Sequence, residues 1–372
     1  MPSVRVSAVR VASMLRNRNL VPEDVSGRLS SALDLRGLAT HDSDVQFEDL
    51  QALGSAFGRP WAYLLVDDPE APPPTGQDHR TVANKRHGFS AELVPELDAA
   101  NGMIDDAIEL FPDIRTTIPH LRLGAGVEPD TAGDSIRVAL GVSIADQVAA
   151  SDEYAALRVW VAALHRQGVF VSQRRLRDPS VRAFSMQRDG RAVVVVDTGD
   201  TAYARVFSLL HEYVHLAMTS AGVCDLDEHT AIERYCNAVT AAALLPRTLL
   251  ANEVAWPWGE ADSEDDAHLR QLSRRLSVSQ AAVLIRLRDL GTLTQGIYEA
   301  LEHRRQGRRT TGTPGGTYYR TEINKVGSLF AHSVFDAYDA GTVDRQDAAA
   351  LLGVGEHNVV RYRSVLDGGR TE

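Results

Sequence analysis

Apolar residues recur at helical spacing along much of the chain. In the first 68 residues this pattern predicts three short helices, over residues 9–18, 22–33 and 47–57. The second begins at Pro22, and proline is favoured in the first turn of a helix. In the third, apolar residues fall at every third or fourth position. We therefore expect the first 68 residues to form a small helical domain.

Longer helices are expected in the rest of the chain. The pattern predicts them over residues 92–111, 144–165, 202–220, 229–245 and 266–290, and a last helical region over residues 321–366. Pro246 ends the fourth of these, because proline cannot continue a helix. A turn at residues 278–280 is expected to divide the fifth into two helices.

Two segments have the composition of β-strands, residues 168–172 and 192–197. The second contains four consecutive valines and ends in turn residues. Such a strand can lie at the edge of a sheet, where an extended peptide could add to it. It can equally be buried on both faces and paired on both sides. The sequence leaves both positions open. The resulting fold class is α+β, mostly helical, with a small β-sheet.

Consecutive prolines mark the clearest domain boundary. Residues 67–74 read Asp-Asp-Pro-Glu-Ala-Pro-Pro-Pro, and prolines remove backbone donors and impose an extended chain. A glycine-rich, basic loop is expected over residues 304–316. We therefore expect a helical domain over 1–68, a linker over 69–81, a main domain over 82–303 and a helical C-terminal region over 304–372.

Size and composition are those of an ordinary globular protein. A chain of 372 residues exceeds one hydrophobic core. The net charge of −11 argues against nucleic-acid binding by the whole chain, although residues 1–40 carry six arginines and three acidic residues, a net of +3. Two cysteines cannot build a disulfide framework, and no signal peptide or long apolar run is visible. We expect a cytoplasmic protein that does not span a membrane.

The residues that carry chemistry begin at His211. His211, Glu212 and His215 form an H-E-x-x-H motif within an apolar helical segment. At about 100° per residue the two histidines lie on one helix face and can reach a single metal. Glu212 stands beside the open coordination position, where it can act as general base toward a water molecule that the metal activates.

The third ligand is expected on the next helix. Glu233 follows His215 after 17 residues, enough for the chain to return antiparallel, and it begins an apolar helix face. Two histidines and one glutamate leave a zinc position open, as catalytic sites require. The alternatives are two core histidines and a surface carboxylate in a first helical turn.

Three neighbouring polar side chains have less specific interpretations. Asn237, one turn after Glu233, could hydrogen-bond a ligand histidine as a second-shell residue, or could be a polar residue in a packing gap. Cys236 is interpreted as a small core residue, because it points about 60° away from Glu233 on the helix. Cys224 is interpreted in the same way.

These motifs resemble the ImmA/IrrE metallopeptidases. The resemblance is carried by residues 207–216, 233–237 and 241–246, which include Leu-Leu-Pro at the end of the second helix. Residues 59–65 and 78–81 are similar to the junction at which a Cro/CI-type helix-turn-helix is fused to this peptidase. Residues 315–320 and 348–354 are similar to the C-terminal region of that subgroup.

The resemblance implies a zincin-like core with a gluzincin-type site. Zn²⁺ would be held by His211, His215 and Glu233, with Glu212 as the base. It also implies a helix-turn-helix-like domain at the N-terminus and a DNA-binding repressor as the protein substrate, cut to release stress-response or mobile-element genes. The N-terminal domain departs from the pattern, because residues 38–45 replace the Trp-Glu-Gly stretch that follows the recognition helix.

Three functions remain to be compared. The first is a zinc endopeptidase acting on a protein. The second is a DNA-binding regulator or antitoxin that keeps the peptidase fold without efficient turnover, with DNA bound by residues 1–66. The third is an oligomeric interaction protein whose N-terminal domain recognises the partner. An intact Glu212 favours the enzyme, because a scaffold has no use for a buried unpaired carboxylate.

Overall fold

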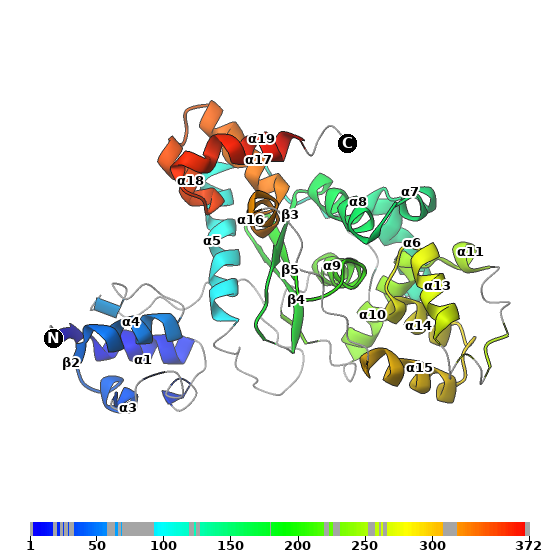
Figure 1. Ribbon diagram of the computed structural model, residues 1–372, viewed down its shortest axis with the longest axis horizontal. Helices are drawn as coiled ribbons and strands as arrows, with labels where there is room; N and C mark the ends of the chain where they lie inside the picture. Colours follow the sequence, from blue (N-terminus) through cyan, green and yellow to red (C-terminus); the bar gives the residue numbers. More distant parts are fainter. Residues whose placement is uncertain are drawn as a thin grey trace. The chain divides into compact units, whose positions relative to one another are not determined.

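The computed structural model divides the chain into two compact units, residues 1–101 and 102–372 (Figure 1). It describes residues 3–17, 33–57, 93–118, 127–178, 180–218, 223–225, 231–251, 257–259, 266–307 and 318–368, with isolated positions at 21, 22, 25, 29, 64, 65, 68, 123 and 262. The linker predicted at 69–81 and most of the predicted helix over 22–33 lie outside these residues. None of the described helices combines the length and apolar character that a membrane span requires.

The first unit contains helices and a two-stranded sheet. Its elements in chain order are β1 (Ser3–Val6), α1 (Ala8–Asn17), α3 (Leu35–Leu38), β2 (Ser43–Gln46) and α4 (Phe47–Ala56). The helices α1 and α4 confirm two of the predicted helices. The strands were not predicted, because four residues are too few for an alternating pattern. They pair antiparallel, with Val4 opposite Val45.

The second unit is built around a four-stranded sheet. Its strands are β3 (Val169–Arg174), β4 (Val181–Arg188), β5 (Arg191–Asp197) and β6 (Val223–Asp225), in the order β3-β5-β4-β6. The pair β3-β5 is parallel, and β4 is antiparallel to both β5 and β6. Strands β3 and β5 confirm the sequence prediction. Strand β4 was missed, because polar residues interrupt its apolar positions.

The valine-rich strand β5 is central, not peripheral. It pairs with β3 on one side and β4 on the other, and every one of its residues is buried. The edge interpretation, in which a substrate adds to this strand, is therefore wrong. Four consecutive β-branched residues reflect a strand that is covered on both faces.

Val195→Pro is expected to yield an insoluble protein or one that no longer binds metal. Val195 lies opposite Ser172 of β3 and Phe184 of β4, so proline removes a ladder donor and disturbs a paired strand. Soluble yield and metal content measure the effect. Val195→Ala is the matched control, since it keeps the N–H and should cost only about 1–3 kcal/mol. A Val195→Pro protein that folds and binds metal like the control would contradict a central position.

Helices make up most of the second unit. The helices before the C-terminal region are α5 (Val94–Leu110, which begins in the first unit), α6 (Pro129–Leu140), α7 (Ile144–Val148), α8 (Glu153–Arg166), α9 (Ala202–Ala217), α10 (Ala231–Leu244), α11 (Arg247–Leu250), α13 (Ala267–Arg275), α14 (Gln280–Asp289) and α15 (Gln295–Gly307). The helix predicted over 144–165 is in fact α7 and α8. The break occurs because the Asp152 side chain accepts a hydrogen bond from Ala155 N (2.7 Å) and starts a new helix there. Helices α6 and α15 were not predicted.

The C-terminal helices pack against strand β3. They are α16 (Tyr318–Val326), α17 (Ser328–Asp339), α18 (Arg345–Leu352) and α19 (Val359–Gly368), as the predicted helical region required. Ser172 of β3 donates a hydrogen bond to Lys325 O (2.5 Å). Gly327, with φ of 82°, lies so close that a Cβ would come within 2.3 Å of Val171 O, so only glycine fits.

The two faces of the sheet are covered by different helices. On one face, Val169, Val171, Val194 and Val196 share a core with α8 and α9. On the other, Phe170 meets the ring of Phe330 in α17 edge to face, at a centroid distance of 5.8 Å. Helix α9, which carries the H-E-x-x-H motif, therefore lies directly against β4 and β5.

Candidate metal site

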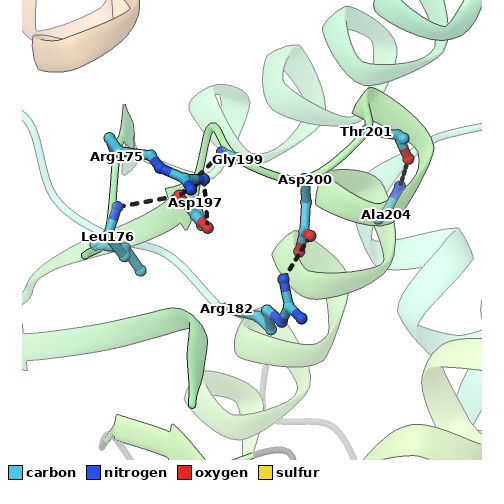
Figure 2. A network of polar contacts seen from close by, with 8 residues as sticks. All are labelled: Arg175, Leu176, Arg182, Asp197, Gly199, Asp200, Thr201 and Ala204. Carbon is cyan, nitrogen blue, oxygen red and sulfur yellow. Dashed lines mark hydrogen bonds and ion pairs between the residues drawn. The ribbon is translucent and has the colours of Figure 1, made fainter. Parts of the chain in front are cut away.

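The start of α9 is fixed by the loop that follows β5. Asp197, the last residue of β5, accepts hydrogen bonds from the backbone N–H groups of Leu176 (3.0 Å) and Gly199 (2.9 Å) (Figure 2). Asp200 forms an ion pair with Arg182 (2.6 Å). Thr201 then caps the helix by accepting from Ala204 N. This connection fixes where α9 begins and therefore which helix face His211 and His215 occupy.

Helix α10 is held at its C-terminal end by side chains from three other helices. Arg137 of α6 donates to Ala243 O (2.9 Å), Gln147 of α7 to Leu244 O (3.0 Å) and Arg286 of α14 to Leu245 O (2.8 Å). The last carbonyls of a helix lack partners inside it, and cations there complement the helix dipole. All three side chains are buried.

The close approach of α6 also fixes α10. A Cβ on Gly133 would come within 2.7 Å of Ala242 Cβ and Ala243 N, so the two helices touch through a glycine. Helix α10 also contacts α9 and α14. Together with the capped C-terminus, these contacts fix the direction in which its first turn presents Glu233 toward α9.

Three predicted ligand side chains converge. Nε2 of His211 lies 3.1 Å from Oε2 of Glu233 and 3.1 Å from Nε2 of His215, which is 3.3 Å from Oε1 of Glu233. His211 is fully buried, and His215 and Glu233 are only 7% and 6% exposed. Among the described residues this is the cluster of histidine, cysteine and acidic side chains with metal-site spacing.

The donor set fits a small divalent metal ion. Ligands at about 2.0–2.2 Å in a tetrahedral arrangement lie roughly 3.3–3.5 Å from one another, close to the separations found. Two imidazole nitrogens and a carboxylate are also the donors that such ions favour. The alternatives of core histidines and a surface carboxylate do not fit, because both histidine Nε2 atoms and the carboxylate face a common point.

Two of these groups have strongly shifted pKa values. Burial would raise the pKa of Glu233, but its contacts with His211 and His215 outweigh that effect and lower the pKa to about 2. Burial would lower the pKa of His215, but its contacts with Cys236 and Glu233 outweigh it and raise the pKa to about 11. The metal-free cluster thus holds a proton at neutral pH, which metal binding must release.

Glu212 lies beside this cluster in an unfavourable environment. The side chain is fully buried, and neither carboxylate oxygen forms a well-aligned hydrogen bond with a described residue. Burial raises the pKa of this carboxyl, and the nearby histidines oppose the shift. Burying a carboxylate without partners costs stability, so its presence indicates a chemical role.

Ser185 of β4 faces Glu212 and was missed by sequence reasoning. Ser185 lies opposite Val194 in the sheet, so its hydroxyl points toward the face covered by α9. The hydroxyl is buried, forms no well-aligned hydrogen bond with a described residue, and lowers the pKa of Glu212 by a smaller amount than burial raises it. No local motif marks it, because it lies 27 positions earlier on a strand that the pattern did not reveal.

The two α10 residues next to Glu233 differ from expectation. Asn237 is buried, and no hydrogen bond joins its side chain to either histidine of the site, so its second-shell role stays a prediction. Cys236 is the residue that touches a ligand. Its Sγ lies 3.9 Å from Nδ1 of His215.

The comparison with protein families identifies the same part of the chain. Residues 164–288 match the model of the IrrE N-terminal-like domain, a peptidase family (Peptidase_M78). No curated protein and no solved structure matches the chain. The matched segment runs from α8 into α14 and includes the sheet, α9 and α10. Residues 164–288, with His211, His215 and Glu233 among them, are therefore similar to a peptidase-type domain of the IrrE N-terminal-like family.

Proposed function

We propose that this protein is a zinc-dependent endopeptidase, with His211, His215 and Glu233 as metal ligands and Glu212 as general base. One observation carries the proposal: the three ligand atoms converge within 3.1–3.3 Å beside a buried carboxylate that has no well-aligned partner. A structural zinc site would use four protein ligands, whereas three leave a position for substrate or water.

Zinc suits this donor set better than other common divalent ions. Magnesium and calcium prefer sites made entirely of oxygen ligands, whereas two imidazoles with one carboxylate are typical of catalytic zinc. When bound, zinc would supply Lewis-acid chemistry, polarising the peptide carbonyl and acidifying water.

The protein's own residues then move the protons. Glu212, one residue beyond His211, accepts a proton from the attacking water and returns it to the departing amine. Its burial keeps the carboxylate from being solvated, so it remains a stronger base than an exposed glutamate. Ser185, facing the carboxylate from β4, helps to hold it in place.

We propose a DNA-binding transcriptional repressor as the substrate, cleaved to release stress-response or mobile-element genes. The resemblance of the motif segments and the family match over residues 164–288 support this proposal. Co-expression with the repressor encoded beside this gene tests it. A shortened repressor is expected with the wild-type chain and not with Glu212→Gln. Equal amounts of full-length repressor in both would count against this substrate.

The first unit is proposed to recognise a protein rather than DNA. Part of its positive charge is not available to phosphates, because Arg10 is only 5% exposed and Arg5 pairs with Asp42 (3.5 Å). Asp34, near the predicted recognition segment, accepts a hydrogen bond from Gly37 N at the start of α3.

The full-length protein is therefore expected to show no sequence-specific binding to its own promoter at nanomolar concentration. Fluorescence anisotropy with promoter DNA and scrambled DNA, over a range of salt concentrations, measures this. Specific binding that weakens with salt would instead support the DNA-binding regulator, with residues 1–66 as its contact.

A further inference from the structure

The thiol of Cys236 lies between a proposed metal ligand and a second sulfur. Its Sγ is 3.9 Å from Nδ1 of His215 and 3.7 Å from Sδ of Met218. Cys236 is fully buried. It follows Glu233 by three positions on α10, so both lie on the side of the helix that approaches α9. The same helix thus supplies one proposed ligand and a contact to another.

The atom facing the thiol is the one that needs a partner. Nε2 of His215 points at His211 and Glu233, so Nε2 is the atom that can bind a metal. A neutral imidazole that ligates through Nε2 carries its proton on Nδ1. That N–H is normally held by a carboxylate, a carbonyl or water, which fixes the ring. Here the nearest described group is Sγ of Cys236.

Met218 completes the arrangement. It is the residue at the C-terminal end of α9, and the thiol of Cys236 donates toward its sulfur. The thiol is therefore oriented with its hydrogen toward Met218 and its lone pairs toward His215. Sulfur is a weak but polarizable acceptor.

The geometry points to Cys236, oriented by Met218, as the positioning residue for His215. It holds the imidazole so that Nε2 faces the metal, and it does so through the Nδ1–H···Sγ contact. This inference rests on the proposed function, because it requires that the cluster bind a metal. It replaces the interpretation of Cys236 as a simple core residue.

Four variants of the full-length protein separate positioning from packing. Cys236→Ala removes the acceptor, and Cys236→Ser keeps a polar acceptor of similar size. Met218→Leu conserves volume but removes the sulfur that orients the thiol. Val239→Ala is the matched control, because it truncates another buried α10 side chain that is not in the cluster.

The readouts are zinc affinity, by competition with a chromogenic chelator, and the visible absorption spectrum of the cobalt(II)-substituted protein. Cys236→Ala is expected to weaken zinc binding about tenfold and to shift the cobalt bands. Cys236→Ser should restore most of the affinity, and Met218→Leu should show a smaller loss in the same direction. Val239→Ala should lower the melting temperature while leaving affinity and spectrum unchanged.

Two results would overturn the inference, and they differ from each other. If Cys236→Ala and Met218→Leu bind zinc as the wild type does, with unchanged cobalt spectra, Cys236 only fills space and the metal site stands. If the wild-type protein itself takes up neither zinc nor cobalt, the proposed metal site fails and the inference fails with it. Should Cys236→Ala not fold, Cys236→Ser and Met218→Leu still decide the first question.

Discussion

Glu212→Gln is expected to lower kcat for peptide cleavage by roughly 10²–10⁴-fold while leaving the metal content unchanged. Glutamine has nearly the same shape but cannot accept the proton of the attacking water. The substituted side chain is not one of the three converging donors, so the ligands remain in place. Cleavage of the substrate and metal analysis of the same preparation measure the two effects.

The same substitution should stabilise the metal-free protein. Glu212 is buried without a well-aligned partner, and a neutral amide costs less to bury than a carboxylate. Because the pKa of Glu212 is raised from the ordinary value of 4.5, the folded state disfavours the ionised form. The destabilisation is therefore absent below pH 4.5 and grows as the pH rises from 4.5 toward the folded-state pKa. The gain in melting temperature should be largest at neutral pH and should shrink on acidification.

Glu356→Gln is the matched control for both effects, because Glu356 is exposed. It should change neither cleavage nor the melting temperature. Full cleavage by Glu212→Gln would exclude Glu212 as the base. A lower melting temperature of the metal-free variant would show that the carboxylate stabilises the fold.

His211→Ala and His215→Ala, and still more the double variant, are expected to lose the metal, from about one equivalent per chain to almost none. Each removes one of three ligands, and the two that remain cannot hold the ion against dialysis. The fold should survive, because α9 is buried along most of its length in a core that extends over several helices and the sheet. Metal analysis and far-UV circular dichroism give the two readouts.

His357→Ala is the control for this loss, because His357 is exposed and far along the chain from the cluster. It should retain the metal. Full metal content in the double variant would show that the ion binds elsewhere, whatever the helical content.

The sequence predicted the cluster because its spacing depends on local geometry. Four positions along one helix place His211 and His215 on one face, and the turn before α10 is long enough to return Glu233 to them. The periodicity of α9 and α10 is also strong, since both are long helices with buried faces. These features need no knowledge of how distant parts of the chain meet.

The features that were missed depend on such distant contacts. The angle along α10 placed Cys236 away from Glu233, but its contact with His215 depends on how α10 crosses α9. Ser185 reaches Glu212 from β4, whose alternation of apolar with polar residues did not stand out. The central position of β5 likewise follows from pairing with β4, which no local pattern announced.

The capped end of α10 makes the geometry of the cluster sensitive to small rotations. With the carbonyls of Ala243, Leu244 and Leu245 all held, a displacement of this helix can only be a tilt about that end. Glu233 lies ten residues away, about 15 Å at 1.5 Å per residue. A tilt of roughly 5° would therefore move its carboxylate by more than 1 Å, comparable to half the length of a ligand bond. Arg286, although distant from the histidines, thus sets the leverage with which the molecule tightens or releases its third donor.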